Sequence, residues 1–111
     1  MRLFPRFAAA IAAALLIATP APAQQGSKFE PQVGQPGKDV IWVPTPDDVV
    51  DRMLLMAQVT PNDFVIDLGS GDGKIAIAAA IKFGARAHGI EYNPDMVRLS
   101  QRNAQAAGVA D

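Results

Sequence analysis

The chain has 111 residues, of which 50% are hydrophobic and 19% are charged, a balance typical of a globular protein and not of a disordered one. Its formal net charge of -1 excludes the strongly basic character of a nucleic-acid-binding domain. Cysteine is absent, which excludes disulfides, thiol nucleophiles and thiolate metal sites.

The first 23 residues are typical of an export signal. Arg2 and Arg6 precede an apolar run at residues 7–18, and the segment Ala21–Ala23 resembles a signal-peptidase site. The run is short for a membrane span, which needs about 20 apolar residues. We therefore expect a signal peptide over residues 1–23, cleaved after Ala23, and an exported, periplasmic product. The alternatives are a retained leader that tethers the protein to the membrane, and a packed alanine-rich helix.

Residues 24–40 contain Gly, Pro, Gln and Ser without a sustained period, which predicts an extended linker that carries no chemistry. Apolar residues at helical spacing then predict a helix from Pro46 to about Gln58, with Thr45 as its cap and Pro46 in the first helical position. We expect Trp42 to pack the linker onto the domain, with stacking on a cofactor as the alternative.

The rest of the chain alternates strands and helices. The stretch FVIDLG has no polar residue before Asp67, which is typical of a parallel strand covered on both faces. His88 lies in the middle of the second strand, where packing is a better explanation than catalysis. The elements expected after the first helix are a strand at 64–69, a helix at 74–83, a strand at 85–92 and a helix at 93–108 capped by Asn93.

This order indicates an α/β fold with a doubly wound sheet, whose ligand lies at the carboxyl ends of the strands. Two strands with three helices leave exposed sheet edges and a small core. We therefore expect the chain to be a fragment, the N-terminal part of a longer domain.

A glycine-rich loop, DLGSGDGK at residues 67–74, joins the first strand to the next helix. A P-loop needs G-x-x-x-x-G-K-[ST], and the stretch fails at Leu68 and at Ile75. A dinucleotide fingerprint needs G-x-G-x-x-G, and Lys74 stands where its last glycine belongs. Gly73 is expected to allow close helix packing.

Charge favours a cationic ligand at this loop. Asp67 and Asp72 are two anions that, about 6 Å apart, repel by roughly 0.7 kcal/mol in bulk water and by several times that near a protein surface. They disfavour a pyrophosphate, although bare amides at a helix start would otherwise attract it. S-adenosylmethionine carries an ammonium and a sulfonium that these acids would attract, and free amides of the turn could take its carboxylate. No two-His or His-carboxylate cluster suggests a metal.

The segment Asp67–Gly73 resembles the D-x-G-x-G-x-G motif of class I S-adenosylmethionine-dependent methyltransferases. Glu91, at the end of the second expected strand, resembles the family's acid that accepts hydrogen bonds from both ribose hydroxyls, and Tyr92 would by the same resemblance lie against the adenine. The resemblance implies a Rossmann-like class I methyltransferase fold, of which residues 41–111 hold the N-terminal half. It implies cofactor-binding roles for Asp67, Gly69, Gly71, Asp72, Glu91, Tyr92 and Thr45.

The order WVPTP, VIDLGSGDG, GIEYNP is most similar to bacterial relatives of the mitochondrial protein-lysine methyltransferases. In such relatives the segment before the first helix closes over the cofactor, which makes Thr45 a candidate contact to its methionine part. The resemblance implies methyl transfer, with a protein lysine as the candidate acceptor. Acceptor residues in this fold usually follow later strands, so no catalytic residue is assigned. The alternatives are an NAD- or FAD-dependent oxidoreductase, which Glu91 would serve equally well, and an exported non-catalytic binding protein.

Overall fold

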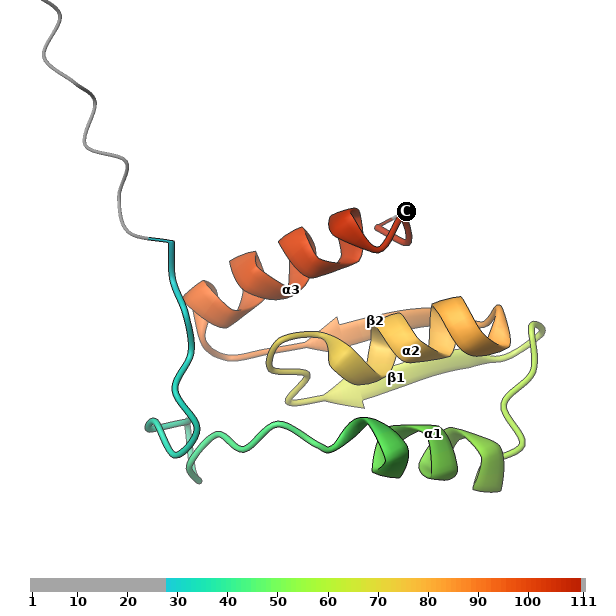
Figure 1. Cartoon of the computed structure of the whole chain (residues 1–111), viewed down its shortest axis with the longest axis horizontal. Coiled ribbons are helices and arrows are strands. Elements are labelled where there is room, and N and C mark those ends of the chain that lie inside the picture. Colours follow the sequence, from blue (N-terminus) through green and yellow to red (C-terminus); the bar gives the residue numbers. More distant parts are fainter. Residues whose placement is uncertain (1–27, 111) are drawn as a thin grey trace, which may run out of the picture.

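The computed structural model describes residues 28–110, which form three helices and two strands (Figure 1). The leader expected over residues 1–23 lies outside this part. Within the described part, no helix is long and apolar enough to cross a membrane. The elements are α1 (Asp47–Met56), β1 (Phe64–Leu68), α2 (Lys74–Phe83), β2 (Arg86–Ile90) and α3 (Pro94–Ala106). Their order confirms the α/β prediction.

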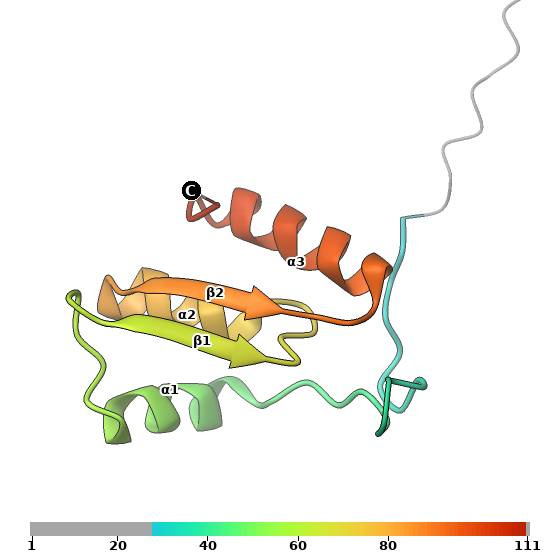
Figure 2. The ribbon, with the colours of Figure 1, turned by 180° about the vertical axis from the view of Figure 1, so that it is seen from behind.

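The two strands are parallel and in register over their whole length, from Phe64 opposite Arg86 to Leu68 opposite Ile90. Both arrows therefore end at one edge of the sheet (Figure 2). The loop after β1 and the residues after β2 leave the sheet side by side. The sequence analysis predicts that the ligand binds at this edge.

Local sequence sets the limits of α2 and α3. Gly84 adopts a left-handed conformation with a φ of 66°, which ends α2. Asn93 caps α3, because its Oδ1 accepts hydrogen bonds from the amides of Asp95 at 2.9 Å and Met96 at 3.4 Å. Pro94 follows in the first turn, where its missing N–H is not needed. Both helices confirm the sequence prediction.

The start of α1 differs from the prediction. The residue before the helix is Pro46, with an extended ψ of 145°, and no side chain caps the helix. The Pro46 carbonyl instead accepts hydrogen bonds from the amides of Val49 at 3.1 Å and Val50 at 3.0 Å. The expectation that Thr45 caps α1 is therefore wrong, because the backbone carbonyl of Pro46, and no side chain, accepts the amides of the first turn.

The core lies on one face of the sheet. Val50 and Leu54 of α1 and Ala79 of α2 are buried, and they pack against Val65 and Ala87 of the strands. α2 therefore lies behind the sheet when the molecule is viewed from its other side (Figure 2).

The opposite face of the sheet is not covered by any residue of the described part. Phe64, Ile66 and Leu68 are 54%, 56% and 78% exposed there. His88, opposite Ile66, is exposed as well, so within residues 28–110 it packs less than expected. The expectation that β1 is covered on both faces is wrong for this part of the chain, because both packed helices lie on the same side.

We expect Asn93→Ala to lower the free energy of unfolding by about 1 kcal/mol, because two amides at the start of α3 lose their acceptor. Asn93→Ser keeps a capping oxygen and should lose much less. Urea unfolding followed by circular dichroism measures both. Equal losses for the two variants would show that the cap is not what stabilises this end of α3.

Candidate functional site

The loop between β1 and α2 depends on glycine. Gly69, Gly71 and Gly73 have φ values of 84°, 54° and 85°, in the left-handed region. An L side chain there costs about 1–2 kcal/mol per residue. A Cβ at position 73 would lie 2.9 Å from the Cβ of Ser100 on α3, which confirms that Gly73 allows close helix packing. The loop and α3 can touch only because that side chain is missing.

Most amides of this loop are already used within the protein. The carbonyl of Ile90, the last residue of β2, accepts two of them at 2.7 and 2.9 Å. The amides with a protein acceptor are those of Gly69, Ser70, Gly71, Gly73 and Lys74. The expectation of free amides is wrong for these residues, because the Ile90 carbonyl, the Glu91 carboxylate and oxygens of the loop itself already accept their hydrogen bonds.

Glu91 joins the two strand ends. One carboxylate oxygen accepts the amide of Gly71 at 2.8 Å, and the other accepts the amide of Asn93 at 2.9 Å. The half-buried carboxylate thus connects the glycine loop to the start of α3. Two hydrogen bonds fix the orientation of the side chain that the sequence placed at the ribose.

Asp67 is the last residue but one of β1, just before the loop, and it is half-buried. Burial raises the pKa of its carboxyl above the ordinary value, and the negative charges of Glu91 and Asp72 raise it further. Glu91 and Asp72 therefore lie close enough to act on the carboxyl of Asp67. A cation bound among them would relieve this repulsion.

A segment that we call the strap, residues 32–45, runs past the loop end of the sheet before α1 begins (Figure 1). The amide of Gly34 donates to the Trp42 carbonyl at 2.8 Å, and the amide of Trp42 donates to the Gln35 carbonyl at 2.9 Å. The strap thus folds back as a small hairpin. The prediction of an extended linker is wrong for residues 34–40, since Gly34, at a φ of 87°, permits the reversal.

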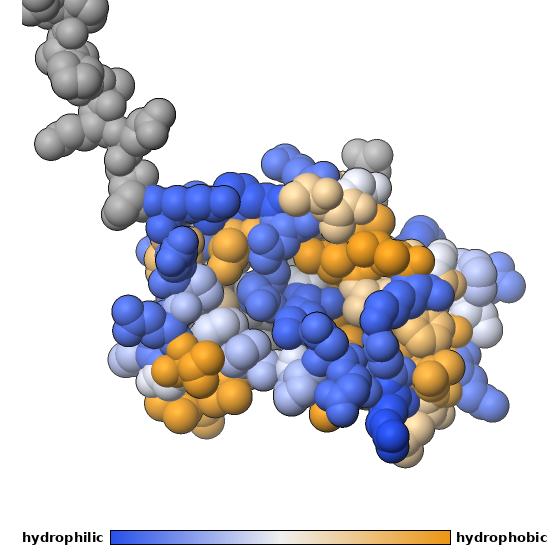
Figure 3. Space-filling model, viewed as in Figure 1, coloured by the Kyte–Doolittle hydropathy of each residue, from blue (hydrophilic) through white to orange (hydrophobic). Residues whose placement is uncertain are grey.

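The strap touches the strand edge at two points. A Cβ on Gly71 would lie 2.7 Å from Nε1 of Trp42, which confirms that Trp42 packs this segment onto the domain. Nζ of Lys38 lies 5.9 Å from the centre of the Tyr92 ring. An apolar patch covers the outer side of the strap (Figure 3), where Val40, Ile41 and Val43 are 78%, 60% and 60% exposed.

A small pocket of about 70 Å³ lies between the strap and the loop. Glu91 instead lines a cleft of about 620 Å³ between α2 and α3, and Tyr92 lines neither. The predicted site residues that the small pocket brings together are Thr45, Asp67, Gly69, Gly71 and Asp72. The bonds of Glu91 to Gly71 and Asn93 connect the two cavities.

The segment at residues 60–111 matches the family model described as a methyltransferase domain. A protein-lysine N-methyltransferase of Saccharolobus islandicus is 46% identical over 71 residues, which cover 63% of this chain and 44% of that protein. The crystal structure of an RNA methyltransferase from Salinibacter ruber in complex with S-adenosyl-L-homocysteine has a TM-score of 0.62 and 58% identity, over 62% of this chain and 45% of that one. Residues 60–111 are therefore similar to part of a methyltransferase domain, and the fold is similar to that of this solved methyltransferase.

A third relative, from Xenopus laevis, is named as a lysine N-methyltransferase of an ATP synthase component. It is 43% identical over 68 residues, which cover 61% of this chain and 29% of that protein. The chain thus spans less than half the length of these three proteins. The segment that matches the family model includes both strands, the glycine loop and Glu91.

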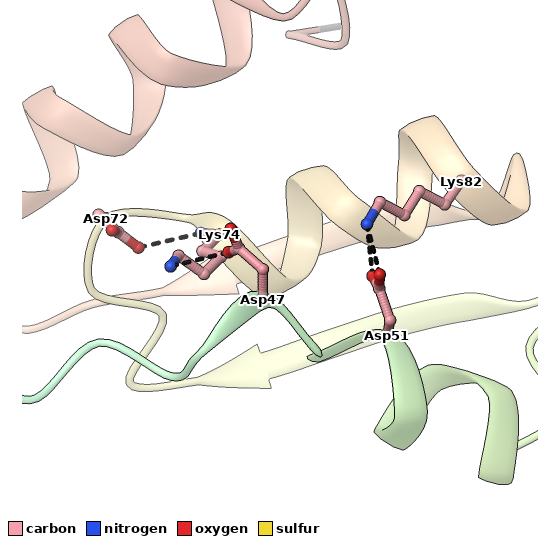
Figure 4. A network of polar contacts seen from close by, with 5 residues as sticks. All are labelled: Asp47, Asp51, Asp72, Lys74 and Lys82. Carbon is pink, nitrogen blue, oxygen red and sulfur yellow. Dashed lines mark hydrogen bonds and ion pairs between the residues drawn. The ribbon is translucent and has the colours of Figure 1, made fainter. Parts of the chain in front are cut away.

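The fold also places at the pocket a cation, Lys74, to which the sequence analysis gave no role. Lys74 lines the pocket, and its Nζ lies 3.0 Å from Oδ1 of Asp47, whose pKa this contact lowers (Figure 4). Further along the same two helices, Lys82 lies 2.5 Å from Asp51, so two ion pairs tie α1 to α2. The sequence offers no reason to assign Lys74 to a ligand, because only the fold brings its side chain to the pocket.

We expect Gly71→Ala to displace the indole of Trp42, since the new Cβ would lie 2.7 Å from its Nε1. Gly69→Ala is the matched control: its φ is also positive, but its Cβ meets nothing within 4 Å. Both variants should lose about 1–2 kcal/mol of stability from backbone strain. Only Gly71→Ala should also change the emission of Trp42, the sole tryptophan. Equal emission spectra would contradict the close contact.

Proposed function

We propose that the whole protein is a methyltransferase that binds S-adenosylmethionine at this edge of the sheet and transfers its methyl group to an acceptor. The raised pKa of Asp67, caused by burial and by Glu91 and Asp72, carries this proposal. An acidic site favours a ligand with an ammonium and a sulfonium over a diphosphate. The relative of known structure, whose complex contains S-adenosyl-L-homocysteine, supports the same cofactor.

The described residues bind and orient the methyl donor. We assign Glu91 to the ribose hydroxyls, because both of its oxygens are held by backbone amides and keep lone pairs for further donors. Asp67 and Asp72 supply negative charge, and Tyr92, 72% exposed beside β2, offers a ring face to the base. When bound, the cofactor supplies a methyl carbon activated by its sulfonium. Orientation of this carbon toward the nucleophile is the contribution of this part of the chain.

A protein lysine is the acceptor that we propose. Two relatives are named as lysine N-methyltransferases, from Saccharolobus islandicus and Xenopus laevis. In the transfer, the neutral lysine amine attacks the methyl carbon, the carbon–sulfur bond breaks, and its electrons remain on the sulfur. RNA is the competing acceptor, because the relative of known structure is named an RNA methyltransferase. Labelled methyl donor added to matched protein and RNA fractions distinguishes the two acceptors by which fraction becomes labelled.

We also propose that the leader directs export and is cleaved after Ala23. S-adenosylmethionine is made in the cytoplasm, so a retained leader with the domain on the cytoplasmic side is the competing arrangement. Mass spectrometry of the N-terminus, together with protease accessibility in intact cells, distinguishes them. An N-terminus at Gln24 supports export, and an uncleaved, protected protein contradicts it.

Calorimetric titration with S-adenosylmethionine tests the cofactor directly. We expect Glu91→Gln to weaken binding by about ten-fold or more, because each hydrogen bond to a charged group contributes about 1.5–3 kcal/mol. Glu30→Gln, at an exposed acid outside the site, should leave binding unchanged. Tight binding of a nicotinamide dinucleotide without any response to S-adenosylmethionine would refute the proposal.

The raised pKa of Asp67 gives a second expectation. The folded state holds this proton more tightly than the unfolded state, so the contribution of Asp67 to stability is lost as the pH rises through its raised pKa. Asp67→Asn removes the buried charge and should raise Tm at neutral pH, while it weakens binding of S-adenosylmethionine. The gain in Tm should shrink as the pH falls toward 3.8, the ordinary value of the group.

Asp48→Asn, at an exposed acid of α1, is the matched control and should raise neither Tm nor the dissociation constant. Scanning calorimetry across this pH range measures the first effect, and isothermal titration measures the second. A fall in Tm for Asp67→Asn at neutral pH would contradict the electrostatic explanation.

A further inference from the structure

The strap has a second face, which points away from the glycine loop. Residues 41–43 alternate in exposure as the residues of a β-strand do. The side chain of Trp42 lies against Gly71, whereas those of Ile41 and Val43 are each 60% exposed. Val40, 78% exposed, extends this apolar patch (Figure 3). The strap therefore packs on the loop with one face and leaves an apolar face open.

The backbone of the same segment is unpaired along one edge. Ile41 and Pro36 form an antiparallel bridge whose hydrogen bonds are made by the neighbouring residues. In a pair of this kind, the N–H and C=O groups of the two bridged residues point away from the opposite arm. Within residues 28–110, no other residue bonds to the backbone amide or carbonyl of Ile41 or Val43.

Proline limits where a further strand could be added to this hairpin. Pro36 occupies the bridged position of the first arm and has no N–H to donate. Pro44 directly follows Val43 and ends the second arm. The free edge that remains, at Ile41 and Val43, combines unpaired donors and acceptors with apolar side chains. Such an edge is a template for β-augmentation, in which an extended peptide binds as an added strand.

This edge borders the proposed methyl-donor site. Val43 lines the small pocket together with Asp67 and Asp72. Lys74 also lines the pocket, but its charge is paired with Asp47 at 3.0 Å. A strand added at Val43 therefore lies beside an acidic pocket, which attracts a lysine side chain and repels a polyanion.

We propose that the free edge of the strap, at Ile41 and Val43, pairs with an extended, apolar segment of the acceptor protein and presents a lysine of that segment to the pocket. The inference rests on the proposed function, and it adds how the acceptor binds. Main-chain hydrogen bonds hold the segment, and the exposed side chains of the strap contact its apolar residues. The charge of the pocket favours a lysine-bearing protein segment over RNA.

Fluorescence anisotropy of a labelled synthetic peptide, measured on the full chain, tests this mode of binding. The peptide alternates valine with threonine around a central lysine, and its matched control has the same side chains but N-methylated amides. We expect the control to bind about ten-fold more weakly or worse, because it lacks the main-chain donors. Glutamate in place of the lysine should also weaken binding by about ten-fold, because it meets the acids of the pocket.

Ile41→Pro removes one donor of the edge and should weaken binding of the unmethylated peptide by about two-fold to ten-fold. Val33→Thr, at an apolar side chain of the other arm that is 69% exposed, is the matched control and should leave binding unchanged. The emission of Trp42 reports whether the strap of the proline variant stays folded. If it does not, the two peptides decide on the wild-type chain.

Equal binding of the plain and N-methylated peptides would overturn the proposal. So would a chain that binds S-adenosylmethionine but no peptide. An RNA oligonucleotide or a lipid vesicle that binds in place of the peptide, or a dimer of the chain that Ile41→Pro abolishes, would assign the edge to another occupant and overturn it too. A chain that does not bind S-adenosylmethionine refutes the proposed function, and the acceptor role of the edge with it.

Discussion

The carboxylate of Glu91 holds the site together. It accepts one amide from the glycine loop and one from the start of α3, at 2.8 and 2.9 Å. Hydrogen bonds to a charged group contribute about 1.5–3 kcal/mol each, and these two connect segments that follow different strands. The loop is thereby fixed in the left-handed shape that only glycine adopts easily, and that shape lets the strap approach Gly71. The same side chain that orients the loop is available to a ribose.

A second consequence of this arrangement is electrostatic. The carboxyl of Asp67 is half-buried and lies near two other acids, which together raise its pKa. At neutral pH the ionised carboxyl of Asp67 lowers the stability of the fold, and it makes the site negatively charged. Binding sites are often less stable than they could be for such a reason. The methyl donor that we propose is cationic and would remove this repulsion when bound. Stability and affinity should therefore respond in opposite directions to the loss of the charge.

The strap depends most on long-range contacts. Its apolar residues show no helical or strand periodicity, and a sequence rich in Gly, Pro and Gln predicts an extended chain. In the structure it is held by backbone bonds between Gly34, Gln35 and Trp42, and by contacts with residues far along the chain, such as Gly71 and Tyr92. No pattern within a few residues encodes these contacts. Its hairpin could not be predicted for that reason, although the contact of Trp42 with the domain could.

The sequence by itself determined the order of the elements, the limits of α2 and α3, the need for glycine in the loop, and the acid after β2, because each depends on side-chain period, capping or spacing within a few residues. The tertiary structure alone decided which loop amides are already bonded, that Lys74 lines the pocket, that Pro46 and not Thr45 directly precedes α1, and that α1 and α2 pack on the same face of the sheet. These features depend on where distant segments meet. Hydrogen bonds and burial between distant segments are set by packing, and no pattern within a few residues of sequence predicts packing.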